Sequence, residues 1–147
     1  MTKNYNILSH TADLRVEVFG KTVEELFKNA AQALTQILSP KTKFGISKSQ
    51  LPISKIELVS NNINTLLVDF LNEILAKSNI NKSVYELKSL RIDEDKIKVE
   101  AELAGIPVTK FEEDVKAVTY HGVDIKQELG TRQQGTGIWK TQLILDI

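Results

Sequence analysis

A chain of 147 residues with 41% apolar and 26% charged side chains can bury the core of one ordinary domain, so we expect a single domain over residues 1–147. Nineteen basic residues balance nineteen acidic ones, which excludes a globally basic, nucleic-acid-binding surface, and the lack of cysteine excludes disulfides and thiolate chemistry. No apolar run approaches the roughly 20 residues of a membrane span. The first residues also lack the apolar core of a secretion signal, so we expect a cytoplasmic protein.

The first predicted strand covers residues 14–19, where apolar and polar side chains alternate until Gly20. A helix follows it. Thr22, with Glu25 three residues on, forms a capping-box pattern, and apolar residues then recur at helical spacing until Ser39-Pro40. This spacing predicts an amphipathic helix with one buried face.

The segment 40–55 holds several lysines, no acid, and the breakers glycine and proline, which is typical of an exposed loop with a local basic patch. Its lysines are Lys41, Lys43, Lys48 and Lys55. A short strand is predicted at residues 56–59. Asn61-Asn62 then provides candidate caps for a second amphipathic helix, which we expect to end near Ser78.

Strands dominate the second half of the predicted structure. Residues 85–92 and 97–103 form an expected hairpin around the acidic turn Asp93–Asp95. Further along, the apolar alternation changes phase at Gly122, which predicts a β-bulge in a strand that continues to about residue 125.

The stretch 130–137 is polar and glycine-rich, and it lacks the spacing of a phosphate-binding loop, so we expect a hairpin tip there. The last predicted strand covers residues 138–147. Two helices among several strands favour an α+β fold, with both amphipathic helices packed on one face of a largely antiparallel β-sheet and the first and last strands adjacent.

An acidic group lies at the end of the last predicted strand. Asp146 is followed by Ile147, whose terminal carboxylate adds a second negative charge, and Asp13 lies at the start of the first predicted strand. If these strands are neighbours, three carboxylates meet. Two carboxylates about 4 Å apart repel by roughly 4 kcal/mol at an effective dielectric constant near 20, so such a group binds a cation or a proton.

Other single residues carry weaker signals. His10 and His121 are the only histidines, and together with carboxylates they could form a zinc site or an acid–base pair. A histidine taken alone is more often a hydrogen-bonded structural residue. Lys116 precedes a predicted strand and by itself indicates only a solvated charge.

Five ordered segments together resemble the archease family over nearly the whole chain. They are His10-Thr11-Ala12-Asp13, Thr22–Ala31, Leu66–Leu75, Val115–Gly122 and Leu145–Ile147. Archeases are known as protein cofactors of the RtcB-type tRNA-splicing RNA ligase. They promote its metal- and GTP-dependent guanylylation and make it a multiple-turnover enzyme. The resemblance therefore implies a partner ligase, no catalytic activity of the chain's own, and only indirect contact with tRNA.

The resemblance also implies a divalent metal ion held by Asp13, Asp146 and the terminal carboxylate of Ile147. Oxygen ligands of this kind suit Ca²⁺, Mg²⁺ or Mn²⁺.

Three further residues from the matching segments, His10, Lys116 and His121, are implied to lie around this site or to face the partner. The chain departs from the family in the short acidic stretch 109–114 and the extended loop 127–137, which puts loop-mediated contacts in doubt.

Two other classes of function stay open. The same carboxylates, with a histidine as general acid or base, could serve an independent metal-dependent phosphoesterase or nuclease acting on RNA. The family has also been regarded as a chaperone-like modulator of tRNA-modifying enzymes. A pure nucleic-acid-binding module would rest on the lysine-rich segment 40–55 alone. The sequence leaves the oligomeric state open.

Overall fold

The computed structural model describes residues 4–10, 13–42, 52–128 and 137–147. In this part of the chain two α-helices alternate with strands and are followed by further strands. In chain order the elements are β1 (Tyr5–His10), β2 (Asp13–Gly20), α1 (Val23–Leu38), β3 (Ile53–Val59), α2 (Ile63–Asn81), β4 (Ser83–Asp93), β5 (Lys98–Pro107), β6 (Ala117–Val118), β7 (Lys126–Glu128) and β8 (Ile138–Asp146).

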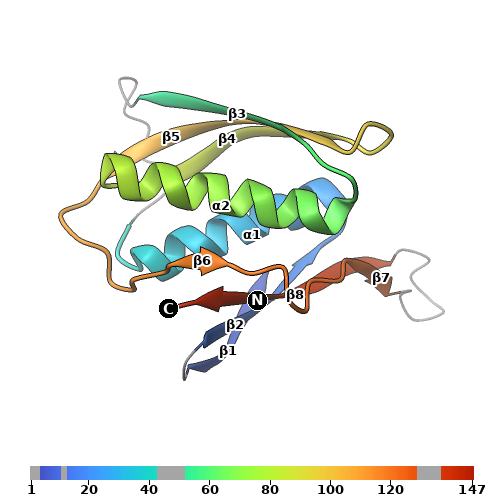
Figure 1. Ribbon diagram of the computed structural model, residues 1–147, viewed down its shortest axis with the longest axis horizontal. Coiled ribbons are helices and arrows are strands. Elements are labelled where there is room, and N and C mark those ends of the chain that lie inside the picture. Colours follow the sequence, from blue (N-terminus) through green and yellow to red (C-terminus); the bar gives the residue numbers. More distant parts are fainter. Residues whose placement is uncertain (1–3, 11–12, 43–51, 129–136) are drawn as a thin grey trace.

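The strands form two antiparallel sheets, and the two helices lie between them (Figure 1). Sheet A has the order β1-β2-β8-β6, and β7 also pairs with β8; sheet B has the order β3-β5-β4. The predicted α+β class is confirmed, as is the adjacency of the first predicted strand, now β2, to the last, β8. The prediction of a single sheet is wrong, because the strands divide into two sheets; both helices lie on the inner face of each. Apolar alternation shows that a strand has a buried face but not which strands it joins.

The core fills the space between the layers. Phe27 of α1 and Phe70 of α2 are fully buried, and their ring centroids lie 5.8 Å apart, so this pair joins the two helices at the centre. Val16 of β2 packs on the helices from sheet A and Leu103 of β5 from sheet B. Because sheets cover the helices on both sides, α1 buries most of its circumference and not one stripe alone.

Both predicted helix caps are confirmed. The side chain of Thr22 accepts a hydrogen bond from the Glu25 N–H at 3.0 Å, and Asn62 accepts one from Thr65 N–H at 2.9 Å. The Glu25 carboxylate reaches back one residue further than a capping box requires and accepts from Lys21 N–H at 2.9 Å.

The hairpin of β4 and β5 is also confirmed, and the Asp93 carboxylate closes its turn by accepting from the N–H groups of Asp95 and Lys96. Helix α2 runs three residues past the predicted end, to Asn81. Lys55 lies within β3 and not in the predicted loop, while Lys43 and Lys48 lie outside the described residues, as do residues 130–136 of the predicted hairpin tip.

The predicted bulge at Gly122 is wrong. Both β6 and β7 pair with β8, but Val118 and Lys126 are eight residues apart while their partners, Leu145 and Lys140, are five apart. Three extra residues therefore leave the ladder as a turn, in which Gly122 has φ 78°, a conformation that favours glycine. Within the described ranges, no helix is both long enough and apolar enough to cross a bilayer.

Strand β1 was not predicted. Its backbone pairs with β2, from Tyr5 opposite Val18 to His10 opposite Leu14, with an irregularity between Ile7 and Ser9. Strand β1 lies at the edge of sheet A, and Ile7 is 52% exposed. An edge strand that buries little has no strong alternation of apolar and polar residues, so the sequence pattern did not reveal it.

Candidate functional site

The first residue of β2 and the last residue of β8 are direct cross-strand partners. Asp13 lies opposite Asp146 in the antiparallel register, where the Cβ atoms of facing residues are about 4.5–5.5 Å apart. Like charges placed directly opposite each other destabilise a sheet. The fold therefore sets two carboxylates opposite each other at one end of the two inner strands of sheet A, a place that we call the carboxylate corner (Figure 1).

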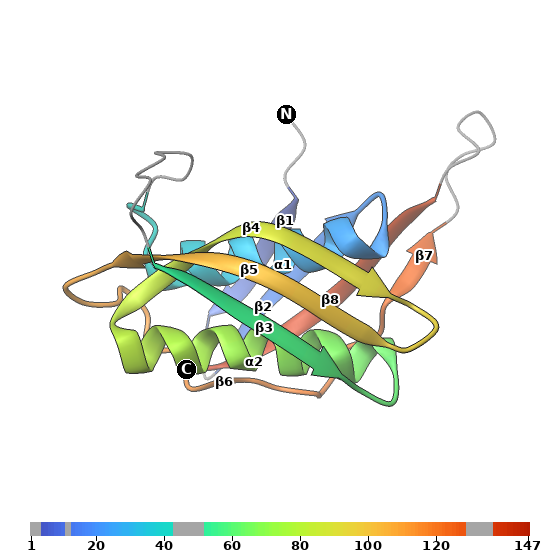
Figure 2. The same cartoon turned by 90° about the horizontal axis from the view of Figure 1, so that it is seen from above.

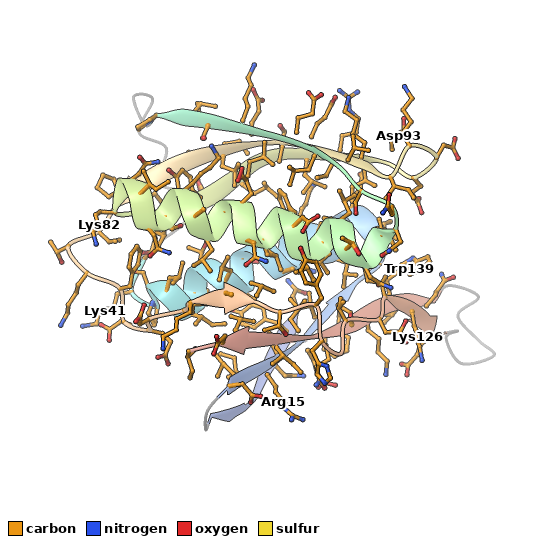
Figure 3. The ribbon with its side chains drawn as sticks, viewed as in Figure 1. Arg15, Lys41, Lys82, Asp93, Lys126 and Trp139 are labelled. Carbon is orange, nitrogen blue, oxygen red and sulfur yellow. The ribbon has the colours of Figure 1, made fainter. Side chains whose placement is uncertain are left out.

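The two carboxylates lie on the outer face of sheet A. Leu14 and Val16 face the helices, so the alternation of side chains turns Asp13 and Arg15 the other way. Figure 3 shows Arg15 on the side of the sheet that faces away from the helices. Its Nε atom lies 3.8 Å from Oδ1 of Asp13, and both side chains are substantially exposed, so this ion pair contributes little stability.

Strand β6 pairs with β8 on the side opposite β2 and so lies beside Asp146. Ala117 is the cross-strand partner of Asp146, and the Lys116 N–H donates a hydrogen bond of 2.7 Å to the Asp146 carbonyl. The Lys116 side chain is exposed. Ile147 is half-buried against the core, which anchors the residue that follows Asp146.

The turn that carries His121 packs against Ile144, which lies on the same outer face of sheet A as Asp146. The Thr119 N–H donates to the Ile144 carbonyl at 2.9 Å, and a Cβ atom added to Gly122 would lie 3.3 Å from Cδ1 of Ile144. Ile144 is two residues from Asp146 on β8, a step of about 7 Å along a strand. The exposed His121 thus belongs to a turn beside the carboxylate corner.

The predicted site residues are therefore brought together to different degrees. Asp13 and Asp146 face each other, and Lys116 and Ile147 adjoin Asp146 through the backbone. His10 ends β1, and its backbone pairs with Leu14; its side chain lies outside the described part of the structure, as do residues 11–12.

Helix α2 holds the β6 segment through side chains that the sequence analysis did not single out. The Asn72 amide accepts from Val118 N–H at 2.8 Å and donates to Val118 O at 2.9 Å, in place of a neighbouring strand. The Tyr120 hydroxyl donates to the Asp69 carboxylate. That hydrogen bond raises the pKa of Tyr120 above its usual value.

A third contact holds the far end of the same segment, where the Asn64 side chain accepts from Ile125 N–H at 2.8 Å. The sequence signal that could have indicated these contacts is the presence of polar residues in the middle of a helix that otherwise faces the core. Asp69 and Asn72 are three residues apart and so share one face.

We expect Asn72→Ala to lower the free energy of unfolding by about 2–4 kcal/mol, because two backbone groups of Val118 lose their partners. Asn72→Asp should lose roughly half as much, since it keeps the acceptor. Urea unfolding followed by circular dichroism measures both. Asn79→Ala, at an exposed position of the same helix, is the matched control; an equal loss there would contradict the proposed contact.

The donor set suits a hard divalent cation, with one condition. In the ranges that the structure describes, no three His, Cys, Asp or Glu side chains gather into a metal-binding group. The pair Asp13 and Asp146 alone supplies two of the predicted donors, and Ile147, predicted as the third, directly follows Asp146.

Asp146 is exposed, and the side chain of Asp13 is 37% exposed. A hollow of about 330 Å³ lies between α1 and β4, and one of about 550 Å³ lies on the outer face of sheet B; neither is lined by a predicted site residue. Exposed carboxylates at the end of two strands suit contact with a macromolecule better than enclosure of a small substrate.

The fold and this corner define a class of small α+β proteins in which two helices lie between antiparallel sheets and carboxylates of β2 and β8 face each other at the strand ends. The model of the Archease protein family matches residues 5–147, and the chain belongs to that family.

Curated relatives agree along nearly their full length. A protein archease from Methanosarcina mazei is 30% identical over 152 residues, covering 99% of this chain and 97% of the relative. One from Pyrococcus abyssi is 28% identical and covers 99% of each chain.

Solved structures share the fold. The solution structure of protein 1598 from Methanobacterium thermoautotrophicum matches with a TM-score of 0.74 at 24% identity, over 99% of this chain and 100% of that chain. The crystal structure of an archease from Thermotoga maritima, described as a possible chaperone, matches with a TM-score of 0.64 at 18% identity, over 97% and 96% of the two chains.

Proposed function

We propose that this protein is a non-catalytic cofactor that activates an RtcB-type tRNA-splicing RNA ligase, promoting its metal- and GTP-dependent guanylylation and its multiple turnover. Membership of the archease family supports this proposal. The observation that carries it at the level of residues is the register of β2 and β8, which sets Asp13 opposite Asp146.

In this proposal Asp13, Asp146 and the carboxylate at Ile147 hold Ca²⁺, Mg²⁺ or Mn²⁺. A bound divalent ion supplies positive charge that neutralises the carboxylates and attracts phosphate oxygens. The chain's own part is to keep the ligands in place: the ladder between β2 and β8 fixes the two aspartates, and contact with the core fixes Ile147.

Neighbouring charged side chains change the electrostatic potential at the carboxylate corner. Arg15 lies close enough to Asp13 to offset part of its charge without closing the site, since the ion pair is exposed. Lys116 and His121 are both exposed, both belong to the segment around β6 that runs beside Asp146, and both are suited to face the ligase. The open position of the corner supports docking on a partner, and this is also compatible with a chaperone-like role.

The test uses the purified ligase with GTP and Mn²⁺, with and without a substoichiometric amount of this protein. We expect faster formation of the ligase–GMP adduct and more than one ligation per ligase molecule. Unchanged adduct formation and unchanged turnover would contradict the proposal.

Two controls separate the alternative functions. RNA or nucleotide hydrolysis by this protein without ligase would favour the phosphoesterase or nuclease. A salt-sensitive gel shift of tRNA halves without ligase would favour a nucleic-acid-binding module.

A further inference from the structure

Strand β3 is an edge strand of sheet B, with β5 on one side only (Figure 2). At its two ends, Gly105 N–H donates to Pro52 O at 3.1 Å and Ser60 N–H donates to Ile97 O at 3.0 Å. Hydrogen-bonded pairs alternate along an antiparallel ladder, so the even-numbered residues of β3 bond to β5. The odd-numbered residues direct their N–H and C=O groups to the other edge. These are Ile53, Lys55, Glu57 and Val59.

No hydrogen bond between described residues occupies those outward backbone groups. The side chains of the same four residues lie on the outer face of sheet B, away from the helices. Ile53 is 55% exposed and Val59 is 66% exposed, which makes this strand one of the most apolar exposed edges in the described structure. An exposed edge of this kind is a template for pairing with another strand.

The strand is self-complementary about its central residue, Ile56. If a second copy pairs antiparallel with Ile56 opposite Ile56, then Ile53 faces Val59 and Lys55 faces Glu57, each twice by symmetry. The exposed apolar side chains then cover each other, and each lysine meets a carboxylate. We propose that β3 is a self-association surface, through which two copies of this chain join their B sheets into one continuous antiparallel sheet.

Charge selects this register over its neighbours. The odd-numbered residues of one copy must face odd-numbered residues of the other, because only these direct their N–H and C=O groups outward. Sliding one strand along the other by two residues is therefore the smallest shift that preserves the hydrogen bonds. A shift one way sets Lys55 against Lys55, and a shift the other way sets Glu57 against Glu57, and like charges directly opposite are destabilising. The Ile56-centred register alone pairs opposite charges.

Ion pairs within the sheet extend this arrangement. Lys55 lies 3.9 Å from Glu102, and Glu57 lies 3.2 Å from Lys98, all on the outer face. The side chains of Lys55 and Glu57 are still 79% and 65% exposed, so each can meet a second partner. Sheet B lies across the helices from sheet A, so this association leaves the carboxylate corner free (Figure 1).

The test is a charge exchange on β3, read by sedimentation over a range of protein concentrations. The unmodified chain should dimerise reversibly. Lys55→Glu leaves only acidic charges on the strand, and Glu57→Lys leaves only basic ones. Each variant alone should therefore raise the dissociation constant of the dimer by roughly tenfold or more. A mixture of the two variants should form a heterodimer, because an acidic strand then meets a basic one.

The double variant Lys55→Glu/Glu57→Lys should recover the homodimer, which separates a pairing defect from a folding defect. Arg91→Glu is the matched control, an exposed charge reversal on β4 of the same sheet, and should leave dimerisation unchanged. The proposal is overturned if the unmodified chain stays monomeric throughout, if either single variant dimerises as well as the parent, or if the mixture gives no heterodimer.

Discussion

Replacing Asp146 by asparagine should lower the proposed stimulation of an RtcB-type ligase by at least about 10- to 100-fold, the loss that is typical even for groups that only support the ligands of a metal site. Asparagine keeps the shape of the side chain and the ladder between β2 and β8 but removes one of the two facing charges. Asp13→Asn should have a similar effect. The measurement is the rate of ligase–GMP formation at a fixed, limiting concentration of this protein.

Glu17→Gln is the matched control for these two variants. Glu17 also lies on the outer face of β2, opposite Gln142, but away from the carboxylate corner. It should stimulate the ligase like the parent protein. If Asp13→Asn and Asp146→Asn stimulate as well as Glu17→Gln, the carboxylate pair plays no part in activation.

Phe70→Ala should lower the free energy of unfolding by about 3–5 kcal/mol, a large part of the stability of an ordinary domain. Phe70 is fully buried and packs on Phe27 of the other helix, so its loss opens a cavity where both sheets and both helices meet. Denaturant unfolding measures this loss.

Ile80→Ala on the same helix is the control, because Ile80 is 80% exposed and should change stability by less than about 0.5 kcal/mol. A small effect at Phe70, or similar effects at both positions, would contradict the described core.

Local signals in the sequence predicted most of the elements. The Thr22 and Asn62 caps, the periodic helices and the hairpin at Asp93 depend on residues within a few positions of each other, and the structure confirms them. The division of the strands into two sheets depends on pairings between distant segments. A strand's alternation is the same in either sheet, so the sequence pattern could not distinguish them.

The departures near β6 have a related cause. The phase change at Gly122 was visible, but a bulge and a longer turn change the phase alike. The segment is also held by the side chain of Asn72, which bonds to Val118 from a helix residue 46 positions away in sequence. Nothing in the segment 115–125 indicates that contact.

The carboxylate corner was predictable only as a consequence of topology. Asp13 and Asp146 mark the ends of two predicted strands, and their meeting required those strands to be adjacent, which the structure confirms. The role of these residues as metal ligands stays a prediction.

The most direct test of the central claim, that Asp13, Asp146 and the chain end bind a divalent cation, is calorimetric titration of the isolated protein with Mn²⁺ and with Ca²⁺. We predict saturable binding to the parent protein that is lost in Asp13→Asn and Asp146→Asn and weakened when a glycine is appended after Ile147. Absence of binding to the parent, or equal binding to all four proteins, would contradict the claim.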